Sequence, residues 1–157
     1  MKKIKIEIAV FFLIVLIVLQ FIKPKKNNLE SIPTSDFITV TNTQETLAEL
    51  LKTSCYNCHS NNSEYPWYSN VAPFSYWISN HISEGKEHLN FSEWEAYSLK
   101  QKINLLNKLE EQVKEKQKMP LRSYLWMHTE AKLSDDQKEK LINWTNDLRF
   151  IYQLGVQ

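Results

Sequence analysis

Glycine is scarce in this sequence: Gly85 and Gly155 are the only two among 157 residues. Because they lie far apart, they cannot form a G-x-G-x-x-G dinucleotide fingerprint, a phosphate-binding P-loop or a G-x-S-x-G nucleophile elbow. Cysteine is equally rare, with only Cys55 and Cys58. The commonest nucleotide-binding and hydrolase signatures are therefore excluded. No pairing of a nucleophile with a base is recognisable either, so we expect a protein that is not an enzyme.

The chain also lacks a strong net charge. It holds 19 lysine and arginine residues against 18 aspartate and glutamate residues, which gives a formal net charge of +1. A protein that binds nucleic acid through its phosphates carries a clear basic excess, so we expect no nucleic-acid partner. Positive charge concentrates in residues 1–26, where six lysines stand against one acid, Glu7. The remainder of the chain is therefore mildly acidic.

The N-terminal apolar run, residues 8–19, is shorter than the usual membrane span of about 20 residues. With its flanks, the segment 4–22 would form a helix of about 28 Å, close to the thickness of the hydrocarbon layer. No small-x-small cleavage site follows this segment. Lys5 and Lys23 flank it on both sides, so the positive-inside rule does not predict its orientation. We expect residues 1–24 to form an uncleaved signal-anchor helix in the membrane. A cleaved signal peptide is the alternative.

The rest of the sequence is expected to fold into helices without strands. Residues 25–42 are polar and contain a proline, which predicts a linker, and residues 43–157 are expected to form the folded domain. Apolar spacing of i, i+3 and i+4, capping boxes at Ser92 and Ser134 and a helix stop at Gly85 set the boundaries. The expected helices cover residues 43–58, 73–84, 92–117 and a last segment from 134. The predicted fold class is all-α, a bundle of about four helices.

One motif carries recognisable chemistry. Residues 55–59 read Cys-Tyr-Asn-Cys-His, the C-x-x-C-H attachment signature of c-type haem. At a helix end, positions i and i+3 share one face, so both thiols can reach the two vinyl groups on one porphyrin edge. The sequence thus predicts one haem c attached to Cys55 and Cys58, with His59 as proximal iron ligand. A dithiol or disulfide pair is the alternative, although no βαβ pattern surrounds the motif.

The second axial ligand of the iron is open to several assignments. Met119 is the first candidate, because a loop methionine followed by Pro120 is stiff enough to present its thioether to iron. Ligation by methionine and histidine raises the reduction potential relative to two histidines. His128 and His81 are the alternatives, and an open distal site is a further one.

Several short segments beyond the motif belong to one recognisable pattern. They are residues 54–61, 65–68, 72–73, 84–86, 89–94, 119–120, 124, 128, 131–134 and 144. Over about residues 40–148 they resemble the small exported haem-binding domain proteins of bacteria, which are similar to class I c-type cytochromes. The resemblance implies a cytochrome c-like bundle around one haem, with Met119 as distal ligand. Lys86 stands where arginine is expected, and Thr129 where proline is usual.

The favoured function is one-electron transfer by a monohaem domain. We expect it to be tethered to a bacterial cytoplasmic membrane through the N-terminal helix, with the haem domain on the periplasmic side, because covalent haem is attached after export. The expected partner is a redox protein that the acidic body attracts through a basic face. A haem-based sensor or accessory module with an open distal site is one alternative. A dithiol or disulfide interaction domain without haem is the other.

Overall fold

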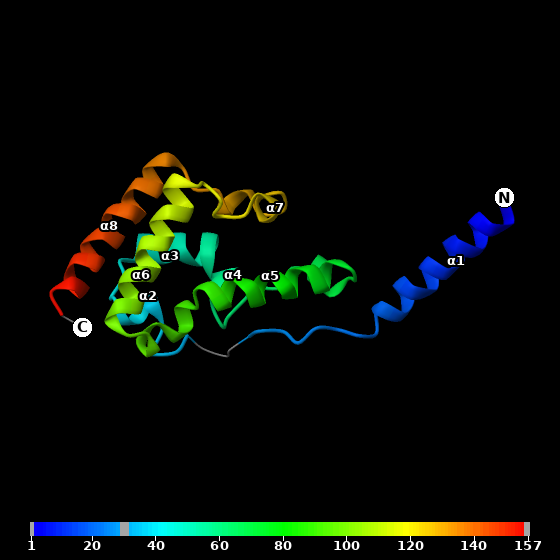
Figure 1. Cartoon of the computed structure of the whole chain (residues 1–157), viewed down its shortest axis with the longest axis horizontal. Helices are drawn as coiled ribbons and strands as arrows, with labels where there is room; N and C mark the ends of the chain where they lie inside the picture. Colours follow the sequence, from blue (N-terminus) through cyan, green and yellow to red (C-terminus); the bar gives the residue numbers. More distant parts are fainter. Residues whose placement is uncertain (1, 29–31, 156–157) are drawn as a thin grey trace.

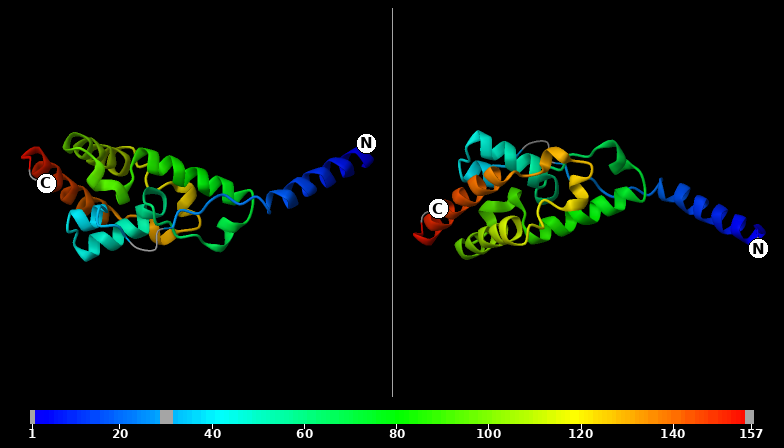
Figure 2. Two further views of the ribbon diagram at one scale, coloured as in Figure 1. Left: turned by 90° about the horizontal axis from the view of Figure 1, so that it is seen from below. Right: turned by 90° about the horizontal axis from the view of Figure 1, so that it is seen from above.

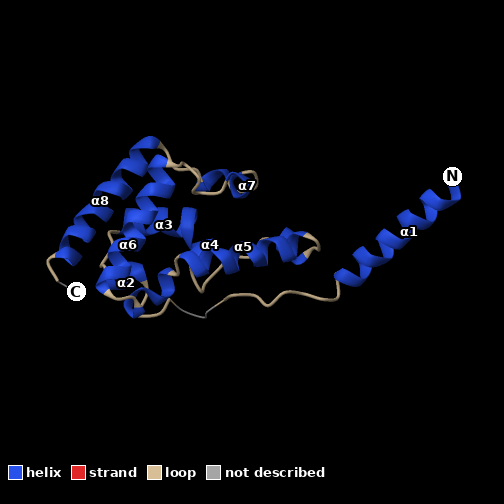
Figure 3. Ribbon diagram, in the orientation of Figure 1, coloured by secondary structure: helices blue, strands red, loops and turns tan. Residues whose placement is uncertain are grey.

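The computed structural model describes residues 2–28 and 32–155, and its regular structure is helical (Figure 3). The α-helices are α1 (Lys2–Leu19), α2 (Phe37–Val40), α3 (Glu45–Leu51), α4 (Asn57–His59), α5 (Phe74–His88), α6 (Leu99–Glu110), α7 (Arg122–Leu125) and α8 (Asp135–Gln153). The 3-10 and π-turns are η1 (Lys52–Tyr56), η2 (Trp67–Asn70), η3 (Phe91–Ala96), η4 (Glu111–Glu115) and η5 (Thr129–Ala131). The β-structure within these ranges is one isolated bridge, between Asn28 and Asn62. The predicted all-α class is confirmed.

The helices α6 and α8 form an antiparallel pair along one side of the body (Figure 1). The apolar side chains of this pair are buried, namely Leu105, Leu106, Leu109, Leu141, Ile142 and Leu148. At the edge of the pair, Arg149 of α8 donates to Glu110 Oε2 of α6 at 3.2 Å and to Asn146 Oδ1 at 2.6 Å. Apolar burial therefore holds the two helices together, and a half-buried ion pair aligns them.

A group of aromatic rings fills the centre of the core. Phe91 stacks on both Phe37 and Tyr56, with centroids 5.1 Å and 5.0 Å apart. Trp94 packs on Phe37 at 4.4 Å, and its indole N–H donates to the Tyr152 hydroxyl at 2.9 Å. Aromatic pairs of this kind add to the stability that burial alone supplies. Phe37 is fully buried, so part of the segment expected to be a linker contributes α2 and a core side chain.

The helix expected to begin at Ser92 starts later in the structure. The Ser92 hydroxyl accepts the Asn61 backbone N–H at 3.0 Å instead of capping a helix, and the segment forms the 3-10 turn η3. In a 3-10 turn, positions i and i+3 lie above one another. This geometry places Phe91 and Trp94 together in the core, where both are buried. The capping box predicted at Ser92 is therefore wrong, because burial of two aromatic rings outweighs a local capping pattern.

The capping boxes of the structure belong to α6 and α8. The first joins Ser98 and Gln101 at the start of α6, which continues into the π-turn η4. The second joins Ser134 and Gln137, as predicted from the sequence, and opens α8. Each box satisfies backbone N–H groups that a helix start leaves without partners.

The N-terminal helix α1 projects away from the body, as Figures 1 and 2 show. Its apolar side chains are largely exposed, and its first turns carry Lys3, Lys5 and Glu7. Of the helices in residues 2–28 and 32–155, none combines the length and the apolar character that crossing a membrane requires. The membrane-spanning signal-anchor helix expected over residues 1–24 is not borne out.

A buried carboxyl group joins α2 to the helical segment that carries the C-x-x-C-H motif. Asp36 Oδ1 accepts the Tyr56 hydroxyl at 2.7 Å and the Ile38 N–H at 3.0 Å, and the second bond caps α2. Asp36 Oδ2 is buried and has no hydrogen-bond partner among the described residues. Burial raises the pKa of Asp36, while the bonds from Tyr56 and Ile38 oppose this rise. The ionised form of Asp36 therefore destabilises the folded state.

Replacing Asp36 with asparagine removes this charge and keeps the helix cap. We expect Asp36→Asn to raise the free energy of unfolding at neutral pH by about 1–3 kcal/mol. Because the folded-state pKa is raised, wild-type stability should fall as the pH rises from 3.8 through that pKa. The advantage of the variant should therefore shrink in acid. Urea unfolding of wild type and Asp36→Asn at acidic and at neutral pH measures the difference in their free energies of unfolding. The same difference at both pH values would contradict the account.

Candidate functional site

The C-x-x-C-H motif lies at the end of one helical segment formed by α3, η1 and α4. Cys55 is part of the π-turn η1, and Cys58 and His59 belong to the last turn, α4. Ser60 adopts an extended conformation, with φ −139° and ψ 171°, which ends the helix directly after His59. A π-turn within an α-helix is frequent at functional sites. The helix predicted over residues 43–58 is confirmed, with the motif at its C-terminus.

The two cysteines are free and half-buried. Burial raises the pKa of Cys55 to about 12, with a further contribution from Cys58, and raises the pKa of Cys58 to about 11. A redox-active dithiol depends on the opposite shift, because the thiolate is the attacking species. The surroundings keep both groups as neutral thiols and disfavour a nucleophilic dithiol centre.

His59 is oriented by a backbone carbonyl group. Its Nδ1 lies 3.0 Å from the carbonyl oxygen of Leu89, the residue that ends α5. This acceptor assigns the ring proton to Nδ1 and leaves a lone pair on Nε2. Burial lowers the pKa of His59, so the ring is neutral at neutral pH. Histidines that bind metals use this arrangement, and two thiols beside one such imidazole fit a haem.

Gly85 allows α5 to approach the motif closely. A Cβ atom at Gly85 would lie 2.5 Å from the carbonyl oxygen of Cys58. The helix expected to stop at Gly85 continues to His88, so the predicted role of this glycine is wrong. Its missing side chain instead gives the Cys58 backbone room. The same close approach brings Leu89 to His59.

Lys86, next to Gly85, binds the segments before and after the motif. Its Nζ donates to Asn27 Oδ1 at 2.8 Å and to Asn61 Oδ1 at 3.3 Å. Asn27 also donates through Nδ2 to the Ser60 carbonyl oxygen at 2.7 Å. In this chain the lysine connects the expected linker to the loop that follows His59.

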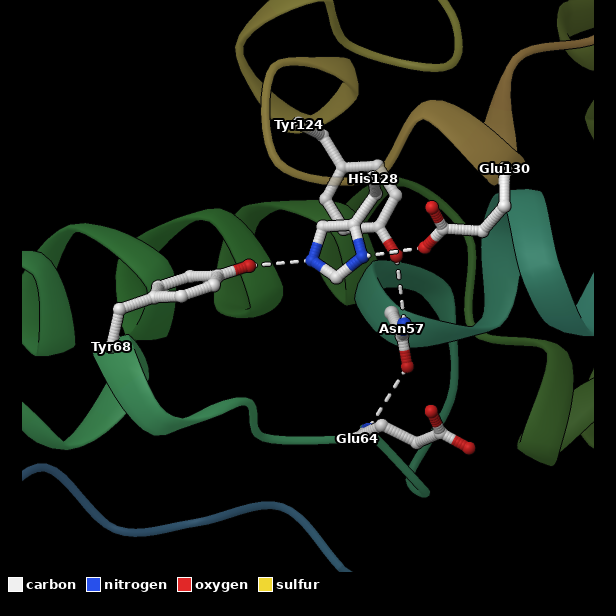
Figure 4. Close-up of polar contacts among 6 residues, drawn as sticks. All are labelled: Asn57, Glu64, Tyr68, Tyr124, His128 and Glu130. Atoms are coloured by element: carbon white, nitrogen blue, oxygen red, sulfur yellow. Dashed lines mark hydrogen bonds and ion pairs between the residues drawn. The ribbon is translucent and has the colours of Figure 1, made fainter.

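His128 is engaged through both ring nitrogens, as Figure 4 shows. Its Nε2 lies 2.5 Å from the Tyr68 hydroxyl oxygen, and its Nδ1 lies 2.9 Å from Glu130 Oε1. The pair with the carboxylate assigns a proton to Nδ1, so that Nε2 accepts from Tyr68 when the ring is neutral. Both nitrogens of this candidate iron ligand are therefore occupied by protein groups.

The ring of Tyr124 connects His128 to the motif (Figure 4). Tyr124 stacks on His128 with centroids 4.3 Å apart and planes 15° apart. The Tyr124 hydroxyl accepts from Asn57 Nδ2 at 2.8 Å, and Asn57 Oδ1 accepts the Glu64 backbone N–H at 2.9 Å. Asn57 is one of the two variable positions of C-x-x-C-H. Through it, the loops around η2 and α7 are tied to the turn that carries the C-x-x-C-H motif.

The other candidate distal ligands occupy different surroundings. Met119 follows the π-turn η4, is half-buried and packs against the hydrophobic core, and its N–H donates to the Gln112 carbonyl oxygen at 3.3 Å. His81 lies on α5, where its Nδ1 donates to the Trp77 carbonyl oxygen at 2.8 Å and its ring packs on that indole. Among the described residues, no hydrogen bond joins either of these residues to His59.

Sequence reasoning did not find several groups that position the motif. Leu89 acts through its carbonyl oxygen, so no residue type marks it. Asn57 and Tyr124 act through a contact between distant segments, and Glu130 acts on His128, two residues before it. The one signal in the sequence was the polar character of Asn57 within the motif, and it does not identify a partner.

The substitution Gly85→Ala tests the close approach of α5 to the motif. Helix propensity alone favours alanine by about 1 kcal/mol. The contact with the Cys58 carbonyl oxygen should outweigh this gain and reverse its sign, with a net loss of stability of about 1–3 kcal/mol. We also expect a lower ratio of haem to protein. Ser83→Ala, at an exposed position of α5, is the matched control for urea unfolding and haem content, and equal behaviour of both variants would contradict the account.

The chain matches one protein-family model, described as a haem-binding domain, over residues 14–147. The match contains the C-x-x-C-H motif, the Tyr68–His128–Glu130 contacts and Met119. Neither the comparison with curated proteins nor the comparison with solved structures gives a match. Because the family model covers most of the chain, the protein belongs to the haem-binding domain family, with haem as its cofactor.

Proposed function

We propose that the chain attaches one haem covalently through Cys55 and Cys58 and binds its iron through Nε2 of His59. The hydrogen bond of 3.0 Å between His59 Nδ1 and the Leu89 carbonyl oxygen carries this proposal. It orients the ring and leaves Nε2 as the coordinating atom. The neighbouring thiols are protonated, and each S–H group can add across one vinyl double bond to form a thioether.

The proposed activity is the transfer of single electrons to and from a redox partner protein. Bound haem supplies an iron that changes its charge by one electron, and the chain holds the group and shields it from water. The His128–Glu130 pair has its other ring nitrogen engaged by Tyr68, so it is not free to accept a proton from a substrate. This arrangement supports an electron carrier over a peroxidase-type enzyme.

Met119 is the distal ligand in this proposal. Its thioether belongs to a half-buried side chain that packs on the core, in surroundings that suit a soft, uncharged ligand. His128 is held through both ring nitrogens, by Tyr68 and Glu130, and this engagement favours Met119 over it. His81 is engaged through Nδ1 alone, by the Trp77 carbonyl oxygen, and stays the alternative ligand.

The proposed location is outside the bacterial cytoplasm, at the cytoplasmic membrane. Two observations support it: the basic and apolar pattern of the N-terminal segment, and the C-x-x-C-H motif, which receives haem after export. The body beyond residue 26 is mildly acidic. It would attract a partner with a basic face, and this attraction would weaken as salt is added.

Covalent attachment is tested by exporting the full chain in a host with the cytochrome c maturation machinery. We expect the wild type to retain haem on a denaturing gel and to give the pyridine haemochrome spectrum of two thioethers. Cys55→Ala should give the spectrum of a single thioether, and the double variant Cys55→Ala/Cys58→Ala should retain no haem. Haem that is lost from the wild type on denaturation would contradict covalent attachment, while leaving non-covalent binding intact.

The distal ligand is tested by Met119→Ala, with Met127→Ala, an exposed methionine, as the control. We expect Met119→Ala to lose the thioether-to-iron charge-transfer band and to have a lower reduction potential, because a thioether favours the reduced iron. The reduced variant should also bind carbon monoxide faster than wild type. An unchanged spectrum in Met119→Ala, with rapid carbon monoxide binding by the wild type, would instead indicate the open distal site of a sensor.

A further inference from the structure

The end of α1 is attached to the body at the junction of η2 and α5. Gln20 exchanges two hydrogen bonds with the backbone of Ala72: its Oε1 accepts the N–H at 3.0 Å and its Nε2 donates to the carbonyl oxygen at 3.2 Å. The Tyr76 hydroxyl contacts the Leu19 carbonyl oxygen at 3.4 Å and also donates to that of Ile22. The C-terminal end of α1 therefore lies against this end of the body, from which the rest of the helix projects (Figures 1 and 2).

A basic hollow lies beside this attachment. It is lined by Lys23, Lys25 and Lys26 from the chain after α1, and by Tyr65, Ser75 and Ser79 from the body. Lys26 Nζ lies 5.1 Å from the centroid of the Tyr65 ring. The lining residues that the structure describes include no carboxylate. Lysine, serine and tyrosine residues thus line one hollow, and their ammonium and hydroxyl groups are donors of the kind that a phosphate group needs.

Exposed aromatic side chains surround the same junction. Trp67 of η2 is 75% exposed, and Phe74 and Trp77 of α5 are 55% and 46% exposed. Phe74 and Trp77 are three residues apart on a helix, so they share one face. Large aromatic rings are seldom left in water in such a group, and tryptophan is enriched where a bilayer meets water. We name these three residues the aromatic rim.

We propose that the basic hollow and the aromatic rim together bind the surface of an anionic phospholipid bilayer. The lysines would take the headgroup phosphate, the aromatic rim would enter the interfacial layer, and the apolar side chains of α1 would lie against lipid. An acidic protein surface would satisfy the lysines but leave α1 and the aromatic rim in water. A bilayer is the one partner that matches the phosphate-binding and the apolar parts of this surface at once.

The test is flotation of the haem-loaded full chain with vesicles of phosphatidylcholine, with and without phosphatidylglycerol. Wild type should bind the anionic vesicles more tightly. The affinity for anionic vesicles should fall at least about tenfold in the triple variant Lys23→Gln/Lys25→Gln/Lys26→Gln, so that it no longer exceeds the affinity for neutral vesicles. Each lysine near an anionic surface contributes about 1 kcal/mol. The control is Lys114→Gln/Lys116→Gln/Lys118→Gln, at exposed positions after α6. This variant should still bind anionic vesicles more tightly than neutral ones. An equal loss in both triple variants would overturn the proposal.

The aromatic rim is tested in the same assay by Trp67→Ser/Phe74→Ser/Trp77→Ser. Binding to both kinds of vesicle should fall, while Trp126→Ser/Met127→Ser, at exposed positions near α7, should bind as wild type. Helical circular dichroism and the haem spectrum report folding, so a failure of lipid binding is separate from a failure of haem attachment. Glycerol 3-phosphate in solution should not displace the protein from vesicles. Displacement would overturn the bilayer assignment and indicate a small phosphate ligand.

Discussion

The hydrogen bond between His59 Nδ1 and the Leu89 carbonyl oxygen is the contact on which the site depends. It exists because α5 reaches the motif, and α5 reaches the motif because Gly85 has no side chain to meet the Cys58 backbone. One helix end thus presents two neutral thiols and an imidazole whose tautomer is set by a backbone group. In the proposed function, this small number of atoms holds the haem.

The remaining contacts hold the loops around the turn that carries the C-x-x-C-H motif. Asn57 connects the motif to Tyr124 and to the backbone of Glu64, and the ring of Tyr124 supports His128 between Tyr68 and Glu130. These polar links join α4, η2, α7 and η5 to one another. The aromatic core and the polar links therefore have separate roles: the core sets the fold, and the links position the loops on which a distal ligand would be carried.

The features that depend on local pattern were predictable from the sequence. The helix ending at the motif and the capping box at Ser134 are examples, because apolar spacing and cap chemistry act within a few residues. The 3-10 turn at Phe91 and the role of Gly85 were not predictable, since each depends on a distant neighbour. The contact of His128 with Tyr68 and the burial of Phe37 within an expected linker also depend on distant neighbours, so they were not predictable either. The expected membrane span failed for a different reason: charges in the first turns of α1 dilute its apolar run.

The most direct test of the account is nuclear magnetic resonance of the reduced, low-spin, haem-loaded protein, with nitrogen-15 in its histidines and carbon-13 in its leucine carbonyl groups. The account predicts a proton on Nδ1 of His59, a scalar coupling across the hydrogen bond to the Leu89 carbonyl carbon, and an Nε2 resonance shifted by iron. A proton on Nε2 of His59, or ring resonances like those of a free imidazole, would show that this histidine does not bind the iron and would contradict the account.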